Sequence, residues 1–144
     1  MRGTRELFLR PRALFPTEKR SMKQETKLTS ASIRYLLALS DLCAGERGAR
    51  CTELAARLGV AKPSAHAMVR SLCEAGLAET ERYGAVFLTP EGRELAARYA
   101  ACYEPLWRRF TGELGLTEET SRAAACAVLA QAPEQLGTLA ERLA

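Results

Sequence analysis

The sequence predicts a mainly α-helical fold that contains one small β-hairpin. Ala and Leu fill most apolar positions of the 144-residue chain, and aromatic residues make up only 6% of it, as is common in helical proteins. From residue 30 onward apolar residues recur at spacings of three and four, the period of an amphipathic helix. The segment 77–89 is the exception, because two runs of strand-forming residues flank a turn there.

The ordered part of the chain is predicted to begin with two helices. The first starts with Thr29 or Ser30 as its N-cap and ends at Gly45. The second is about two turns long; it starts with Thr52 as its N-cap and ends at Gly59. A short helix thus follows a longer one.

A third helix and the hairpin come next. Pro63 suits the first turn of this helix because its missing N–H would be unpaired there, and Gly76 closes the helix. The hairpin turn falls at Arg82, Tyr83 and Gly84. Three further helices are expected: one from Thr89 into a turn at Gly112 to Gly115, one from Thr117 to Ala130, and one from Pro133 to Ala144.

A helix, a short helix, a third helix and a hairpin in this order are typical of a winged helix-turn-helix, in which the hairpin is the wing. The second helix braces the third, whose first turns enter the major groove of DNA. Short or basic side chains are expected there, because they reach base edges and phosphates. The candidate DNA-binding residues are Lys62, Pro63, Ser64, His66, Ala67, Arg70, Arg82 and Tyr83.

Single members of this set also have structural interpretations. Ser64 is a candidate cap for its own helix, and Arg70 is a candidate ion-pair partner of Glu74 one turn later. Arg82 is equally well explained as a solvent-exposed charge at the hairpin turn. The prediction of a DNA-binding surface therefore depends on the arrangement of these residues more than on any one of them.

Basic charge is concentrated at the N-terminus. The net charge is +4, and residues 1–27 hold eight basic and three acidic side chains, so the remainder is close to neutral. Without a sustained apolar period, residues 1–27 predict a disordered basic arm. A winged helix-turn-helix DNA-binding domain is expected at 28–92 and a helical dimerisation region at 93–144. DNA affinity of the folded part must come from a local basic face.

The composition argues against several other classes of protein. No run of about 18 apolar residues is present to span a membrane, and arginines interrupt the start of the chain, so we expect a cytoplasmic protein without a membrane partner. Five cysteines without a C-x-x-C pair predict reduced thiols. A single histidine, no Gly-rich phosphate loop and no paired carboxylates indicate that the chain is not an enzyme.

Four segments resemble the diphtheria-toxin-repressor family of iron- and manganese-responsive repressors: Thr52 to Val60, Pro63 to Leu72, Glu74 to Leu77 and Tyr83 to Gly92. The match is densest from 52 to 92 and weaker to residue 144. It implies a homodimeric transcriptional repressor that binds a palindromic operator in double-stranded DNA, with a dimerisation and metal-sensing region after the wing. The wing also resembles that of multiple-antibiotic-resistance-type regulators, but it lacks their Asp-Arg-Arg element.

The resemblance also implies a divalent transition metal, Mn, Fe or Zn, as cofactor. Two family ligands in the first helix fall on Ala31 and Arg34, neither of which binds a cation. Iron(II) and manganese(II) need several carboxylate and imidazole ligands, and thiols make a softer site. The other family ligands fall near Cys102 to Glu104 and on Cys126, Leu129 and Ala130, which leaves Cys102, Glu104 and Cys126 as candidates.

Two interpretations of Cys126 stay open. It is either a buried apolar side chain in its helix, or part of a zinc or redox site with Cys102. Two functions also stay open. The first is a DNA-binding repressor. The alternative, favoured by the near-neutral body, is a winged-helix module that binds a protein partner through the wing or the C-terminal helices.

Overall fold

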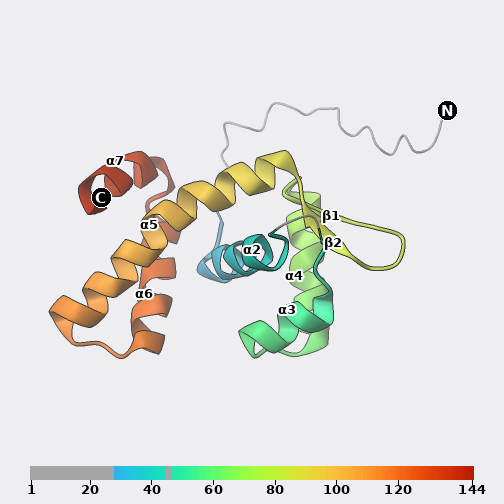
Figure 1. Ribbon diagram of the computed structural model, residues 1–144, viewed down its shortest axis with the longest axis horizontal. Helices are drawn as coiled ribbons and strands as arrows, with labels where there is room; N and C mark the ends of the chain where they lie inside the picture. The colour runs from blue at the N-terminus through green and yellow to red at the C-terminus, as the bar shows by residue number, and fades with distance from the viewer. Residues whose placement is uncertain (1–27, 45–46) are drawn as a thin grey trace.

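The computed structural model describes residues 28–44 and 47–144 (Figure 1), so the basic arm expected at 1–27 and the helix end expected at Gly45 lie outside the described residues. The described part is mostly helical with one hairpin, which confirms the predicted fold class. Its elements are α2 (Ser30–Leu42), α3 (Cys51–Leu58), α4 (Lys62–Glu74), β1 (Ala78–Thr80), β2 (Val86–Leu88), α5 (Pro90–Leu114), α6 (Glu118–Gln131), the 3-10 turn η2 (Pro133–Gln135) and α7 (Leu136–Leu143).

Helix α2 lies at the centre of the fold. Ile33, Leu36 and Leu39 are fully buried, and Tyr35 and Ala38 are nearly so. Helices α3, α4, α5 and α6 all pack against α2, and strand β2 of the hairpin also contacts it. More than one face of α2 is therefore covered. The spacing of three and four predicts a single apolar face for an amphipathic helix. Tyr35 and Ala38 lie outside that spacing, so their burial results from tertiary packing.

The N-terminus of α3 corrects one prediction. The helix begins at Cys51 with Arg50 as its N-cap, whereas Thr52 lies exposed in the first turn. The backbone N–H of Arg50 donates to the Glu53 carboxylate at 3.0 Å, and this hydrogen bond is the main cause that lowers the pKa of Glu53. Because Glu53 satisfies the backbone at this end of the helix, no hydroxyl is needed at the N-cap.

The hairpin is antiparallel, and its register pairs Ala78 with Leu88 and Thr80 with Val86. A third segment joins it at Ala49, whose N–H donates to the Val86 carbonyl at 2.9 Å and whose carbonyl accepts from the Val86 N–H at 2.7 Å. The loop before α3 is therefore tied to the wing by main-chain hydrogen bonds.

The start of α5 is fixed against the turn that follows α4. Thr89 caps the helix as predicted: its hydroxyl accepts from the Gly92 N–H at 3.0 Å and donates to the Gly76 carbonyl at 2.7 Å. A Cβ placed on Gly92 would lie 2.0 Å from the carbonyl oxygen of Leu77. Helix and turn thus approach so closely that only glycine fits at position 92.

The ends of the C-terminal helices differ in two places from the predictions. Helix α5 runs through Gly112 to Leu114 and stops at Gly115, whose φ is 74°, so one glycine of the expected turn is helical. Pro133 begins a 3-10 turn, and the last helix starts only at Leu136. Thr117 does cap α6, as predicted.

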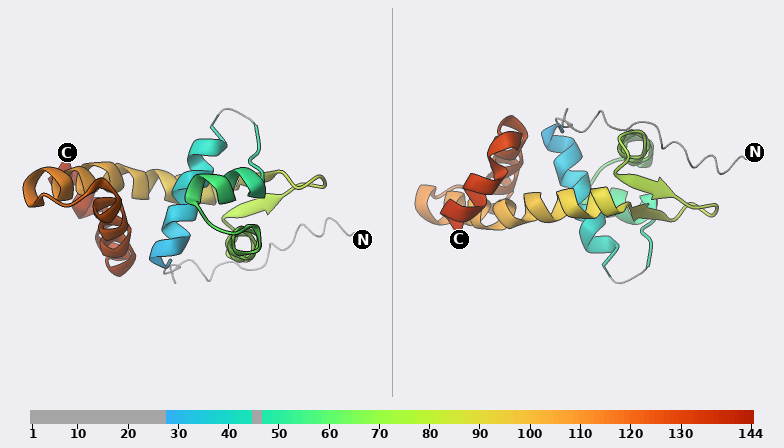
Figure 2. Two further views of the ribbon diagram at one scale, coloured as in Figure 1. Left: turned by 90° about the horizontal axis from the view of Figure 1, so that it is seen from below. Right: turned by 90° about the horizontal axis from the view of Figure 1, so that it is seen from above.

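Helix α5 connects the two ends of the molecule. Helices α3 and α4 and the hairpin lie at its N-terminal end, and α6 and α7 pack along it towards its C-terminal end, as Figures 1 and 2 show. Helix α2 contacts both groups, since it packs on α3 and α4 and also on α5 and α6. In the described part of the chain, no helix has the length and apolar character that crossing a membrane requires.

Candidate nucleic-acid interface

Helix α4 has one buried and one exposed face. Ala65, Val69 and Leu72 point into the core, and Met68 is half-buried at its edge. Because residues three and four apart share a helix face, the positions between them point outward. The exposed residues include Lys62, Pro63, Ser64, His66, Ala67 and Arg70, the full set that the sequence pattern selected on this helix, and also Ser71 and Glu74.

Two structural interpretations of these residues find no support in the geometry. Ala61, and not Ser64, is the N-cap of α4, and no side chain caps this helix end. Glu74 makes no ion pair with Arg70 among the described residues. Within the same ranges Lys62 and Arg82 also lack a hydrogen-bond or ion-pair partner. Their charges are free to bind anions.

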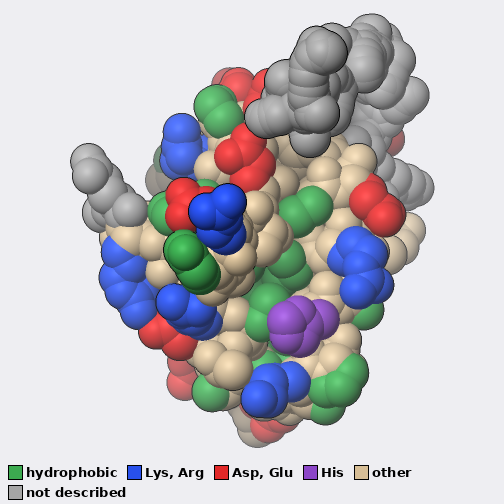
Figure 3. All heavy atoms as spheres, turned by 90° about the vertical axis from the view of Figure 1, so that its right-hand side faces the viewer, with side chains coloured by type: hydrophobic (Ala, Val, Ile, Leu, Met, Phe, Trp, Pro, Cys, Tyr) green, Lys and Arg blue, Asp and Glu red, His purple; other side chains and the backbone are tan. Residues whose placement is uncertain are grey.

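The surface around α4 carries charges of both signs, and basic side chains lie near His66, the single histidine of the chain. Figure 3 shows basic side chains on several sides of the histidine, with acidic side chains interspersed among them. Residues 28–92 contain seven basic and seven acidic side chains. Two of the basic side chains, Arg47 and Arg57, are paired with Glu53 and Asp41. The local field at α4 therefore comes from the unpaired basic side chains and not from net charge.

The wing presents a polar tip next to α4. The Glu81 N–H donates to the Ala85 carbonyl at 2.8 Å, and Gly84 turns the chain with a φ of 88°. Arg82 is exposed, and 77% of Tyr83 is accessible to solvent. Both side chains are thus placed to contact a bound partner.

Arg50 is a residue of this surface that the sequence reasoning missed. Its guanidinium donates to the main-chain carbonyl of Tyr83 at 2.7 Å, so it braces the wing tip against the start of α3. The only signal in the sequence was an arginine before a helix, which usually indicates a solvated charge. The contact spans 33 residues and becomes visible only in the folded chain.

The three candidate metal ligands lie in different surroundings. Cys102 is fully buried, and its Sγ donates to the carbonyl of Leu136 at 3.3 Å. Glu104 is exposed and pairs with Arg108 at 2.6 Å. Cys126 is buried in α6. The described residues contain no group of three or more His, Cys, Asp or Glu side chains arranged to hold a metal ion.

Burial also keeps the thiols of the two candidate ligands, Cys102 and Cys126, protonated. It raises the pKa of Cys126 to about 11, with a nearby Arg34 opposing the shift, and it raises the pKa of Cys102. The thiolate is the form that binds metals and reacts with oxidants. The chemistry of these side chains therefore fits a buried apolar role better than a metal or redox site.

The raised pKa of Cys126 predicts a loss of stability at alkaline pH. The folded state holds this proton up to about pH 11, whereas the unfolded chain releases it near pH 9, so the contribution is complete below pH 9 and lost between pH 9 and 11. We expect the free energy of unfolding to fall by about 2 kcal/mol across this window. Urea denaturation at pH 8 to 11 measures it.

Cys126→Ala is the control, because the Cys126 part of this decline must vanish in the variant. At pH 8, iodoacetamide should label the half-buried Cys73 before Cys126, with mass spectrometry identifying the modified peptides. Equal labelling rates at the two cysteines would contradict the buried, protonated thiol.

Comparison with known proteins gives consistent matches. The IclR helix-turn-helix domain matches residues 34–82. The transcriptional regulator MntR of Salmonella typhimurium is 34% identical over 88 residues, which are 61% of this chain and 55% of that protein. The chain thus spans little more than half the length of this curated relative.

Two solved structures share the fold at lower identity. The manganese regulator SloR has a TM-score of 0.62 at 20% identity, over 78% of this chain and 51% of that one. The IdeR protein of T. acidophilum has a TM-score of 0.57 at 20% identity, over 76% of this chain and 52% of that one. The described helices and wing therefore have the arrangement of these regulators.

Proposed function

We propose that this chain, which is 34% identical to the transcriptional regulator MntR over 88 residues, is a DNA-binding transcriptional regulator that acts as a repressor. The observation that carries the proposal is the exposed face of α4, where Lys62 and Arg70 have no protein partner within the described ranges. Helix α4 enters the major groove and brings Ser64, His66 and Ala67 to base edges. Lys62, Arg70 and Arg82 bind phosphates beside it.

The assembly that we propose is a cytoplasmic homodimer on a palindromic operator in double-stranded DNA. Residues 28–92 bind DNA, and residues 93–144, which include α5 to α7, form the dimerisation region. Two copies related by a twofold axis place two α4 helices on successive major-groove segments about 34 Å apart. The chain has no enzymatic role in this proposal.

We further propose that DNA binding does not depend on a divalent metal. One solved structure of the same fold is named a manganese regulator, but the ligand positions that the family resemblance implies carry Ala31, Arg34, Leu129 and Ala130 in this chain. An alanine or leucine offers no ligand atom, and a guanidinium repels a cation. The donor set does not fit Mn²⁺ or Fe²⁺.

Fluorescence anisotropy with a labelled duplex from the protein's own promoter tests these proposals. We expect binding that weakens as salt rises, is tighter than to a scrambled duplex, and is the same in EDTA as in about 1 mM Mn²⁺. Binding that appears only with Mn²⁺ would contradict the metal-independent proposal. No preference over the scrambled duplex would contradict the repressor.

A winged-helix module that binds a protein partner is the second candidate. The observation that favours it is the pair of exposed carboxylates, Glu79 and Glu81, on and beside β1, because like charges on the wing oppose contact with phosphates. In this case the duplex would not bind at low salt, where electrostatic attraction is strongest.

A further inference from the structure

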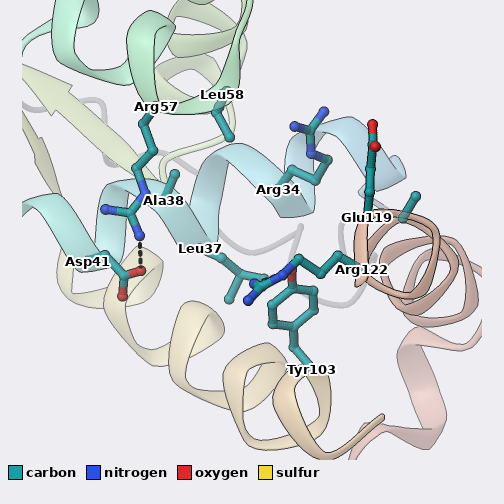
Figure 4. Close-up of a pocket in the computed structure, with 10 residues that line it drawn as sticks. Arg34, Leu37, Ala38, Asp41, Arg57, Leu58, Tyr103, Glu119 and Arg122 are labelled. Atoms are coloured by element: carbon teal, nitrogen blue, oxygen red, sulfur yellow. Dashed lines mark hydrogen bonds and ion pairs between the residues drawn. The ribbon is translucent and has the colours of Figure 1, made fainter. Parts of the chain in front are cut away.

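A cavity lies between helices α2 and α3 on one side and helices α5 and α6 on the other. It is bounded by α2, α3, α5 and α6, as Figure 4 shows, and its volume is about 390 Å³. Cavities of about 300 to 1,000 Å³ hold small organic ligands. The lining residues are Arg34, Leu37, Ala38, Asp41, Arg57, Leu58, Tyr103, Glu119, Arg122 and Ala123.

The arginines that line this cavity differ in what they already bind. Arg57 is paired with Asp41 at 2.6 Å. Arg122 pairs with Glu118 at 2.7 Å, lies 4.1 Å from the centre of the Trp107 ring and donates to the Tyr103 hydroxyl at 3.4 Å. These contacts hold Arg122 in one orientation before any ligand arrives.

Arg34 is the lining cation without such a contact. Across the described ranges it has no ion-pair or hydrogen-bond partner, although Glu119 lines the same cavity. In Figure 4 its side chain rises from α2 between Leu58 and Glu119. A guanidinium presents several N–H donors in a fork that matches a carboxylate, so this side chain has unused capacity to bind an anion.

The rest of the lining is apolar. Leu37 and Ala38 come from α2, Leu58 comes from the end of α3, and Ala123 comes from α6. A cavity with an apolar wall and a few fixed polar groups selects a ligand that has an apolar body and one polar end. Arg57 and Arg122 are already paired with carboxylates, so the unpaired Arg34 is the group that favours an anion as the polar end.

We propose that this cavity binds a small organic carboxylate. The carboxylate is bound by Arg34 and by the Tyr103–Arg122 pair, and the apolar body of the ligand packs on Leu37 and Leu58. Arg34 also disfavours a metal ion here, because a cation would meet an unpaired guanidinium.

A ligand in this cavity would contact two groups of helices at once. The cavity is bounded by α2 and α3 on one side and by α5 and α6 on the other, so a ligand that fills it couples α2 and α3, against which α4 packs, to the proposed dimerisation region. This regulatory role rests on the proposed function, since it requires that the chain bind DNA. Binding of the carboxylate in the cavity does not require that the chain bind DNA.

Thermal unfolding of the full chain with benzoate as the probe tests the proposal, with sodium chloride balancing the ionic strength. We expect benzoate at about ten times its Kd to raise Tm by about 3 °C, whereas neutral benzamide, of the same shape, leaves it unchanged. Arg34→Gln should abolish the shift. Arg109→Gln removes an exposed arginine of α5 outside the cavity lining and should retain it.

The proposal would be overturned if the Tm shift survived in Arg34→Gln or if benzamide gave an equal shift. It would also be overturned if benzoate gave no Tm shift up to about 50 mM, because specific binding is rarely weaker than that. Isothermal titration gives the affinity independently. The anisotropy measurement is then repeated with benzoate. A changed DNA affinity supports regulation, and an unchanged one removes only that role. If the chain bound no DNA, the benzoate result would still decide the cavity.

Discussion

Gly92→Ala should lower the free energy of unfolding by about 3 kcal/mol. The added Cβ would lie 2.0 Å from the Leu77 carbonyl oxygen and 2.9 Å from its carbonyl carbon. Both atoms are main chain, and the same carbonyl accepts a hydrogen bond from the Thr89 N–H at 3.1 Å. Relief of the clash therefore has to move α5 away from the turn after α4 and break that hydrogen bond.

Gly112→Ala is the matched control, because Gly112 lies in the same helix and a Cβ there would meet nothing within 4 Å. Alanine is favoured over glycine in a helix, so this variant should gain about 0.5 to 1 kcal/mol. Urea or thermal denaturation of both variants followed by circular dichroism measures the difference. Equal stability of the two variants would show that the close approach at Gly92 is wrong.

The double substitution Lys62→Gln and Arg70→Gln should weaken DNA binding about 10- to 100-fold at low salt. Each removes one positive charge from the exposed face of α4 without breaking a contact among the described residues. Two fewer phosphate contacts should also reduce the slope of log K against log salt by about 2. Fluorescence anisotropy at several salt concentrations measures both quantities.

Its control is Arg109→Gln with Arg142→Gln, which removes the same charge from exposed positions in α5 and α7. The C-terminal end of α5, which carries Arg109, and helix α7 lie away from α4 (Figure 1). Affinity and salt slope should stay within about twofold of the parent protein. If both double variants weakened binding equally, overall charge and not the α4 face would be responsible.

The order of the elements could be predicted because each has a local cause. Gly59 is the C-cap of α3 and has a φ of 68°, and Gly76 directly follows the C-cap of α4 and has a φ of 80°. Thr89 and Thr117 are the N-caps of α5 and α6. The exposed face of α4 followed from helical spacing alone. Where α3 begins could not be predicted, because Glu53 replaces the usual hydroxyl cap.

The candidate cavity and the wing brace were beyond sequence reasoning. Arg50 reaches Tyr83 over 33 residues, and the four helices around the cavity are brought together only by packing on α2. Cys102, Glu104 and Cys126 looked like a group in the sequence, but Glu104 faces solvent while the two thiols are buried. Cys102 and Glu104 are only two residues apart in α5, but residues at that spacing point to different faces of a helix.

The sequence by itself determined the helices, the hairpin and the exposed face of α4, since spacing, caps and glycines act within a few residues. It also determined that Ala31 and Arg34 are not metal ligands, because that depends only on side-chain chemistry. The tertiary structure decided what surrounds each of the other side chains. It left Lys62, Arg70 and Arg34 unpaired among the described residues and placed Arg34 in the lining of a cavity, since ion pairs and cavities depend on distances between elements far apart in the chain.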